Sequence, residues 1–233
     1  MAAQPTPAHP ATMLAEVQAK ASDQPSDSAL PEPLFRTQRL LARPLHPQDA
    51  ESSQRACAPA SITRYMSLAF SHPYTLEHSV AWIAMQKDAP HNNLALTTSS
   101  DPATVIGGIG LKPGADIQSH TGEVGYWLSE AHQGQGMMQE ALAGFVEWTF
   151  LHRTGNGGHV EQVSLPGRAR KTRLFAAVFA ENVASMRVLE RCGFVREGVQ
   201  RGQVVTRYGE VMDLHLFGLG KGEWEERRKG REQ

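Results

Sequence analysis

The sequence has little of what marks several large classes of protein. Two cysteines in 233 residues, Cys57 and Cys192, are too few for a disulfide scaffold or a cysteine-rich zinc site. The 23 basic side chains are balanced by 24 acidic ones, which excludes a strong basic field for gripping nucleic acid. The apolar runs fall far short of the ~18 residues that a membrane-spanning helix needs. We therefore expect a cytoplasmic chain with neither a nucleic-acid nor a membrane partner.

Residues 1–33 differ in composition from the rest of the chain. They contain six of the 14 prolines and neither glycine nor an aromatic residue. Such a segment buries too little apolar surface to offset the entropy lost on ordering it. We predict a disordered tail over 1–33, one folded domain over 34–220 and a charged, fraying tail over 221–233. Within the domain, the glycines, the single proline and the basic side chains of 152–171 predict a flexible basic insertion.

The apolar pattern predicts a mixed α/β domain. Strands are expected at 37–45, 93–98, 104–111, 123–129, 173–179, 194–197 and 211–217. Helices are expected at 47–57, 74–88, 136–151 and 182–192. The turn at 99–102 joins two of the strands in an antiparallel hairpin. This order of elements favours a mixed sheet with helices on its faces over an all-parallel sheet.

Two of the helices show which residues should cap or bury them. Thr75 is the expected N-cap of the second helix, with Leu76, Val80 and Ile83 on one face. Asn182 is the expected N-cap of the fourth. The inner face of the third helix is predicted to consist of Met138, Ala141, Leu142, Phe145 and Val146.

Residues 122–140 are the segment that most clearly indicates a ligand-binding site. There a strand runs into a glycine-rich turn, and a helix begins near Gly136. Glycines let a backbone approach a ligand closely. The first N–H groups of a helix lack partners and carry positive partial charge, which makes such a turn a candidate anion site. Tight strand-to-helix packing would use the same glycines. The residues expected to line the site are Gln133, Gly134, Gln135, Gly136, Met137 and Met138.

Other phosphate and metal patterns fit less well. A dinucleotide fingerprint needs a third glycine where Gln139 stands, and an acidic residue after a second strand, where the basic insertion follows instead. Neither a GxxxxGK[ST] loop nor a GxSxG turn occurs. The ten histidines show no ligand spacing, so no metal is expected. A NAD-dependent oxidoreductase remains the less favoured alternative.

Two blocks of sequence together resemble the GCN5-related N-acetyltransferases, the GNAT superfamily. Gln133-Gly-Gln-Gly-Met-Met138 is similar to the family's acyl-CoA motif, Gln/Arg-x-x-Gly-x-Gly/Ala. Residues 181–194 are similar to its Asn-x-x-Ser helix and the Gly-Phe strand start that follows. Met138 departs from the small residue of the broad family but is typical of the RimJ/RimL-like branch, which acetylates ribosomal-protein N-termini. That branch also shares a strand like Gly125-Tyr-Trp127, and the resemblance spans about residues 35–219.

The resemblance implies a GNAT fold, with a mixed, mostly antiparallel sheet of six or seven strands and about four helices. It also implies transfer of an acetyl group from acetyl-CoA to a primary amine by direct attack in a ternary complex. The amine would belong to a protein N-terminus or a small molecule, and the enzyme would be a monomer or homodimer. A catalytically silent acyl-CoA-binding module is the alternative from another class, because it would carry the same motifs.

The resemblance also assigns roles to single residues. The turn at 133–138 would hold the coenzyme's diphosphate, and the pantetheine arm would lie along Trp127, Leu128 and Ser129, where this strand separates from 173–179. The backbone N–H of Leu128 is the candidate oxyanion donor. Asn182 would contact the arm, and Ser185 would contact it and hydrogen-bond the leaving thiolate.

The attacking amine must be neutral. At pH 7, deprotonation costs about 1 kcal/mol for an α-amine but roughly 4–5 kcal/mol for a lysine. Glu123 is the candidate base by analogy with the family, and an ordered water or a merely solvent-facing glutamate are the alternatives. Asp213 and Tyr208 are weaker acid or base candidates, and Trp82 is a candidate wall of the acceptor pocket. Cys192 is expected to pack at a helix end rather than act as a nucleophile.

Overall fold

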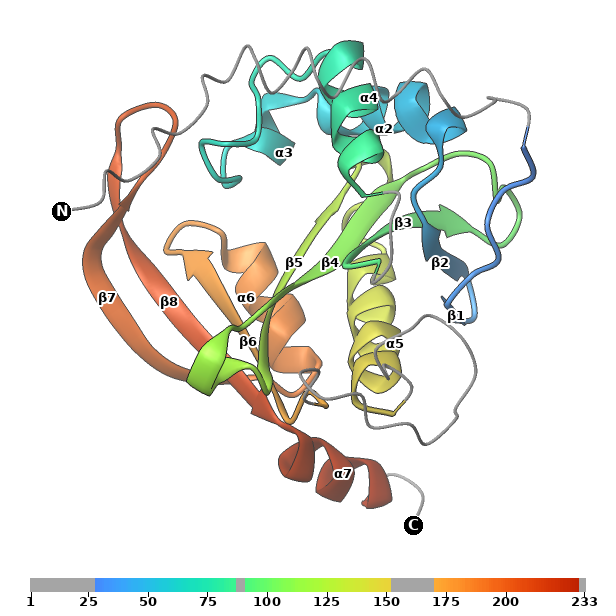
Figure 1. Ribbon diagram of the computed structural model, residues 1–233. Helices are drawn as coiled ribbons and strands as arrows, with labels where there is room; N and C mark the ends of the chain where they lie inside the picture. Colours follow the sequence, from blue (N-terminus) through green and yellow to red (C-terminus); the bar gives the residue numbers. More distant parts are fainter. Residues whose placement is uncertain (1–27, 87–90, 152–169, 231–233) are drawn as a thin grey trace, which may run out of the picture.

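The computed structural model describes residues 28–86, 91–151 and 170–230. Its centre is an eight-stranded sheet in the order β1-β2-β3-β4-β5-β6-β8-β7 (Figure 1). The strands are β1 (Phe35–Arg36), β2 (Leu40–Pro44), β3 (Asn93–Thr98), β4 (Gly107–Pro113), β5 (Thr121–Leu128), β6 (Arg173–Phe179), β7 (Val195–Val205) and β8 (Val211–Gly220). Only β5 and β6 pair in parallel; the other neighbours in the sheet are antiparallel. The predicted mixed, mostly antiparallel sheet is confirmed.

Six α-helices accompany the sheet in the described part of the chain. They are α2 (Ala50–Cys57), α3 (Ala60–Thr63), α4 (Leu76–Met85), α5 (Met137–Leu151), α6 (Val183–Arg191) and α7 (Lys221–Lys229). Three short 3-10 turns complete the list: η1 (Pro47–Asp49), η2 (Asp116–Gln118) and η3 (Glu130–His132). The expected counts of six or seven strands and about four helices were too low, because β1 and α3 are too short to leave a periodic pattern.

The C-terminal segment is ordered where a fraying tail was expected, so that prediction was wrong for residues 221–229. Glu223 accepts a hydrogen bond from the Gly220 backbone N–H at 2.7 Å, which caps α7. The ring of Trp224 packs on Phe150 with centroids 5.6 Å apart, and this anchors a helix whose other side chains are mostly charged. The predicted tail over 1–33 and the insertion over 152–171 lie almost entirely outside the described residues.

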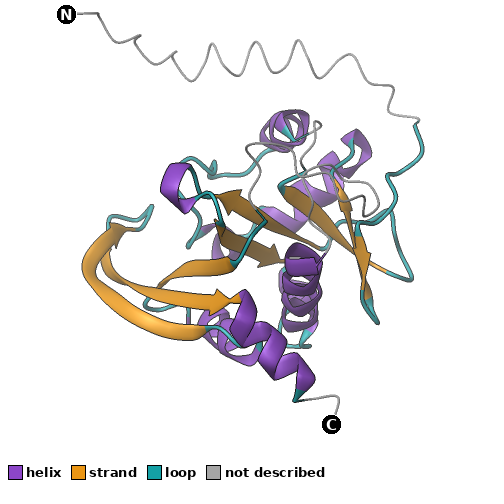
Figure 2. Ribbon diagram, turned by 60° about the horizontal axis from the view of Figure 1, so that its bottom comes forward, coloured by secondary structure: helices purple, strands orange, loops and turns teal. Residues whose placement is uncertain are grey.

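β7 also extends further than the sequence indicated. It continues to Val205 and stays paired with β8 through two register shifts. Figure 2 shows this long hairpin curving away from the rest of the sheet. The bulges account for the error, because they interrupt the alternation that marks a strand in the sequence.

Helices cover both faces of the sheet. The main core lies between the sheet and α5 and α6, and it includes every predicted inner-face residue of α5. A smaller cluster on the other face joins Cys57, Ile62 and Tyr74 to Trp127 of β5. Because side chains alternate along a strand, Val124 and Leu128 enter the main core while Trp127 points to the opposite face.

The α4 helix confirms its predicted cap but only part of its predicted buried face. The Thr75 hydroxyl accepts a hydrogen bond from the His78 backbone N–H at 3.4 Å. Leu76, however, is 42% exposed, and the buried positions are Ser79, Ala81 and Ile83. Small residues therefore take part in packing α4 against its neighbours, which a search for large apolar residues does not detect.

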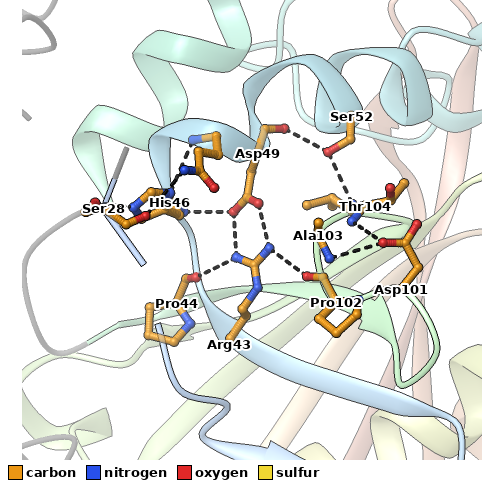
Figure 3. Close-up of polar contacts among 12 residues, drawn as sticks. Ser28, Arg43, Pro44, His46, Asp49, Ser52, Asp101, Pro102, Ala103 and Thr104 are labelled. Carbon is orange, nitrogen blue, oxygen red and sulfur yellow. Dashed lines mark hydrogen bonds and ion pairs between the residues drawn. The ribbon is translucent and has the colours of Figure 1, made fainter. Parts of the chain in front are cut away.

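A buried ion pair fixes α2 to the sheet (Figure 3). The Arg43 guanidinium donates to both carboxylate oxygens of Asp49, at 2.8 and 2.6 Å. It also donates to the carbonyl oxygens of Pro44 and Pro102, both at 3.2 Å. Asp49 in turn accepts from the His46 backbone N–H at 2.8 Å. One buried arginine thus ties β2, the start of α2 and the β3–β4 turn together.

Candidate active site

A gap opens between β5 and β6. The two strands pair only where Thr121–Glu123 meets Arg173–Phe175, and each then continues without the other, to Leu128 and to Phe179. The separation that the family resemblance implied is therefore present. Glu123 occupies the last paired position, at the closed end of the gap.

Hydrogen bonding decides which backbone groups face this gap. The Ser129 N–H donates to the Ile106 carbonyl at 2.8 Å, on the β4 side. N–H groups alternate in direction along an antiparallel strand, so those of Leu128 and Tyr126 point away from β4, toward the side of β6. Of the three residues expected along the pantetheine arm, Leu128 has the suitable backbone direction, whereas the Ser129 N–H is engaged within the sheet.

The turn after β5 is shaped by two glycines in the left-handed region, Gly134 (φ 71°) and Gly136 (φ 74°). A Cβ at Gly134 would meet nothing within 4 Å, and at Gly136 it would meet only an Arg39 nitrogen at 3.8 Å. The glycines are therefore required by conformation, and the space above them is open. Because α5 begins at Met137, its first N–H groups lie at this open turn without helical acceptors.

The other residues of the turn serve it in different ways. Gln133 donates from its side-chain amide to the Leu128 carbonyl at 2.9 Å, and Gln135 to the Ala131 carbonyl at 2.9 Å. Met138 is buried in the main core, and Met137 packs against that core. These four side chains hold the turn in place, so a ligand would meet mainly backbone amides.

Arg39 reinforces this turn from a distant part of the sequence. Its Nε donates to Glu140 Oε2 at 2.6 Å, and its Nη1 to the Gln135 carbonyl at 3.0 Å. Glu140 also accepts from the Thr37 hydroxyl at 2.6 Å. Burial opposes ionisation of Glu140, but these hydrogen bonds and the Arg39 charge hold its pKa below the ordinary value. Sequence reasoning missed Arg39, because it lies 101 residues from its partner.

On the α6 side of the gap, Ser185 meets a tyrosine from β5. The Ser185 and Tyr126 hydroxyls are 2.9 Å apart, and Tyr126 also lies within donating distance of the Ser185 carbonyl, at 3.2 Å. Asn182 caps α6 as predicted, its Oδ1 accepting from the Ser185 backbone N–H at 3.2 Å. Burial raises the pKa of Tyr126 despite the Ser185 hydrogen bond, so its phenol stays protonated. Tyr126 had no assigned role from the sequence.

Glu123, Gly125 and Trp127 lie on the face of β5 opposite to that of Tyr126. The Glu123 carboxylate is 35% exposed and lies 4.0 Å from the ammonium of Lys112, which is itself 85% exposed. Such an ion pair adds little to the stability of the fold, because water screens both charges. Glu123 is therefore accessible on the face that does not hold Tyr126 and Ser185.

The remaining candidates are Asp213, Tyr208, Trp82 and Cys192. Asp213 accepts from the Gly202 backbone N–H at 2.8 Å and so supports the β7–β8 hairpin. Tyr208 is 52% exposed beside His72, and Trp82 is 37% exposed on α4, outside the cluster that holds Trp127. Cys192 is only half-buried, and its thiol donates to the Gln139 carbonyl at 3.3 Å, which links α6 to α5.

Buried Cys57 is no better a nucleophile, because burial raises the pKa of its thiol to about 12. Among residues 28–86, 91–151 and 170–230, no cluster of three or more His, Cys, Asp or Glu side chains forms a metal site. Nor does any helix in these ranges have the length and apolar character needed to cross a membrane.

Known proteins are similar to this chain in sequence. Residues 39–195 match the model of an acetyltransferase (GNAT) domain. The uncharacterized N-acetyltransferase YoaA of Bacillus subtilis (strain 168) is 26% identical over 194 residues, covering 81% of this chain and 97% of that protein. The probable N-acetyltransferase YjcK of the same strain is 31% identical over 120 residues, covering 52% of this chain and 56% of that protein.

Solved structures agree at the level of the fold. An acetyltransferase of the GNAT family from Bacillus anthracis superposes with a TM-score of 0.65 at 19% identity, covering 81% of this chain and 98% of that one. The microcin C7 self-immunity acetyltransferase MccE, solved with acetyl-CoA and AMP, gives 0.61 at 17% identity, covering 78% and 93%. The match of the domain model over 39–195, together with this fold, shows that the chain belongs to the GNAT acetyltransferase family.

Proposed function

We propose that this protein transfers the acetyl group of acetyl-CoA directly to a primary amine. One observation carries the proposal: β5 and β6 part beyond Glu123, and the Leu128 N–H points into the gap beside an open glycine turn. A thioester placed in that gap meets a backbone donor, and a diphosphate at the turn meets the first amides of α5. MccE, which shares the fold, was solved with acetyl-CoA bound.

The coenzyme would be held mainly by backbone. The amides of Gly134 to Met138 face its diphosphate, with the turn kept in shape by the side chains of Gln133 and Gln135. The pantetheine amides pair with the free edge of β5 through the Tyr126 backbone groups and the Leu128 carbonyl, as an added strand pairs with a sheet edge, which leaves the Leu128 N–H for the oxyanion. Asn182, at the start of α6, contacts the arm from the other side of the gap.

The transfer requires one bond to form and one to break. The amine nitrogen bonds to the acetyl carbon, the carbon–sulfur bond breaks, and the electron pair leaves on sulfur. Leu128 N–H stabilises the oxyanion, and losing such a donor typically costs about 3 kcal/mol in the barrier. Glu123, directly or through a water, takes the amine proton, and Ser185, held by Tyr126, hydrogen-bonds the departing thiolate.

An α-amine suits this site better than a lysine. The Glu123 carboxylate is 35% exposed, and the charged group that lies near it is the ammonium of Lys112, 4.0 Å away. An α-amine needs only about 1 kcal/mol to be neutral at pH 7, whereas a lysine needs roughly 4–5 kcal/mol. A RimJ/RimL-like role on protein N-termini fits, and the ribosomal-protein-serine acetyltransferase of Escherichia coli (strain K12) is 32% identical over 78 residues, 34% of this chain and 35% of that protein. A match this short supports the N-terminal role but not a serine acceptor.

Release of free thiol from acetyl-CoA, measured against a panel of amines and short peptides, tests the proposal. We expect binding of acetyl-CoA below about 100 μM, turnover with at least one amine, and slower turnover with an altered pH profile in Glu123→Gln. Binding without thiol release for any amine would favour the silent acyl-CoA-binding module. Binding of NAD in place of acetyl-CoA would favour the oxidoreductase.

A further inference from the structure

The sheet has an apolar face beside the gap that the helices α5 and α6 do not cover. On β6 and β8, one set of alternate residues belongs to the main core: Leu174, Ala176, Val178, Phe217 and Leu219. The other set points to the opposite face and is only half-buried, although its Phe179 ring packs against the ring of Tyr65 with centroids 5.6 Å apart. We call this set the open face: Phe175, Ala177, Phe179, Leu214 and Leu216. The register pairs Ala177 with Leu216 and Phe179 with Leu214, so these side chains lie next to one another.

The open face is continuous with the proposed catalytic groups. Phe175 stands directly opposite Glu123 in the β5–β6 register, and opposite residues point to the same face. Along β5, the same face continues through Gly125 to Trp127. The Trp127 indole lies over Gly108, since a Cβ added at Gly108 would be 2.5 Å from Trp127 Nε1. An amine that enters the gap from this side would meet the Glu123 carboxylate at one end and apolar side chains on both strands.

Gly125 enlarges the space between Glu123 and Trp127. A Cβ added at Gly125 would meet nothing within 4 Å, and Gly125 is not among the residues with positive φ. Neither the backbone conformation nor close packing therefore requires glycine here, although glycine weakens a strand interior. The missing side chain leaves room on the acceptor side of β5.

Charged groups on and around the open face pair with partners from the protein itself. Arg173, on the same face as Phe175, bridges Glu197 over Gly218. Arg64 bridges Glu181 at 3.0 Å and Glu210 at 3.2 Å. Arg207 donates to the carbonyl oxygens of Thr63 (2.9 Å), Ser67 (3.3 Å) and Phe70 (3.0 Å), which ties the β7–β8 turn to the segment after α3. An acceptor with a second charge would have to bury that charge against Phe175, Ala177 and Leu216 without a dedicated partner.

We infer that the acceptor carries an apolar group next to its primary amine, and that this group packs on the open face. This inference rests on the proposed acetyl transfer. Two kinds of acceptor have a primary amine next to an apolar group: a peptide whose first residue is large and apolar, and a small aryl- or alkyl-alkylamine. The apolar open face disfavours polyamines and acidic amino acids as acceptors.

The test compares acceptors that differ only in the group beside the amine. Thiol release from acetyl-CoA would be measured with leucinamide, phenylalaninamide, serinamide and aspartamide, with peptides that begin with the same residues, and with phenethylamine and spermidine. We expect kcat/KM to be at least tenfold higher for the apolar acceptors than for their serine, aspartate and polyamine counterparts. Equal or faster turnover of serinamide or spermidine would overturn the inference.

A binding measurement separates the failure of this inference from the failure of acetyl transfer. Calorimetry with CoA-saturated protein should show phenylalaninamide binding at least tenfold more tightly than serinamide. Tight binding of phenylalaninamide without thiol release would overturn the transfer reaction and support the open face. Thiol release with no preference for apolar acceptors would support the transfer reaction and overturn the role of the open face. The peptide and small-molecule arms identify which source the site accepts.

Filling the space above Gly125 gives a matched variant. Gly125→Val adds a side chain into open space on a strand, so we expect a folded protein with unchanged affinity for acetyl-CoA and a KM for phenylalaninamide raised at least tenfold. The control is Gly222→Val on α7, where a Cβ also meets nothing within 4 Å. An unchanged KM in Gly125→Val would show that the acceptor does not use this face.

Discussion

Arg39 directly precedes β2 and Arg43 lies within it, four residues further on, and each is paired with a carboxylate in a different environment. The Arg43 and Asp49 side chains are 2% and 0% exposed, whereas those of Arg39 and Glu140 are 42% and 18% exposed. The first pair joins elements of the fold, and the second joins β2 to the glycine turn. Similar hydrogen bonds therefore occur in two settings: the buried pair ties elements of the fold together, and the more exposed pair lies at the glycine turn, where we propose that the coenzyme binds.

The largest effect is expected on breaking the buried pair. Arg43→Met leaves the Asp49 carboxylate buried without its cation, and removing one partner of such a pair typically costs about 3–5 kcal/mol. The free energy of unfolding, measured in urea, should fall by that amount. The double variant Arg43→Met/Asp49→Leu should recover part of the loss, because no unpaired charge remains. A loss below about 1 kcal/mol for Arg43→Met would show that the pair does not hold α2 to the sheet.

At the turn beside Arg39, the expected effect is on binding. Gly136→Asp places a carboxylate where the proposed diphosphate must sit, so affinity for acetyl-CoA should fall at least a hundredfold in a calorimetric titration. The control is Gly209→Asp, because Gly209 has a similar φ of 81° and equally open space, but lies in the β7–β8 turn. Both variants should lose about 1–2 kcal/mol of stability from the left-handed conformation. Equal affinity for acetyl-CoA in the two variants would refute the diphosphate assignment.

Removing Arg39 itself should produce a smaller change of the same kind. Arg39→Ala deprives the Gln135 carbonyl of its donor and leaves the Glu140 charge unbalanced next to the turn. We expect affinity for acetyl-CoA to fall about tenfold, while the stability lost with such a half-exposed pair stays within about 1 kcal/mol. Arg36→Ala, which removes an exposed pair with Glu32, is the control. A stability loss as large as that of Arg43→Met would erase the distinction between the two arginines.

The same contrast explains which parts of the molecule the sequence could predict. The glycine turn, the inner face of α5 and the Asn182 cap depend on residues a few positions apart, so local patterns predicted them. Arg39 with Glu140 and Tyr126 with Ser185 are 101 and 59 residues apart, and no spacing signals such contacts. The strand at 173–179 was predicted from its apolar residues, but which of its faces stays uncovered depends on where α5 and α6 pack. The helix α7 was missed because Trp224 anchors it through Phe150, far away in sequence.

The smallest expected effect is the pH dependence of the exposed pair. Burial disfavours the Glu140 carboxylate, but hydrogen bonds from Thr37 and Arg39 and the Arg39 charge outweigh it and lower its pKa. A carboxyl whose folded pKa lies below its unfolded value stabilises the fold fully above the unfolded value, about 4.3, and loses that contribution as the pH falls through the folded value. The free energy of unfolding of Glu140→Gln should therefore lie below that of the wild type at pH 7, by no more than about 1 kcal/mol, and the two should converge as the pH falls from about 4.3 through the folded value. A difference that widens on acidification would mean that Glu140 is held in its protonated form, and that Arg39 acts on the turn without the charge pairing that sets it apart from Arg43.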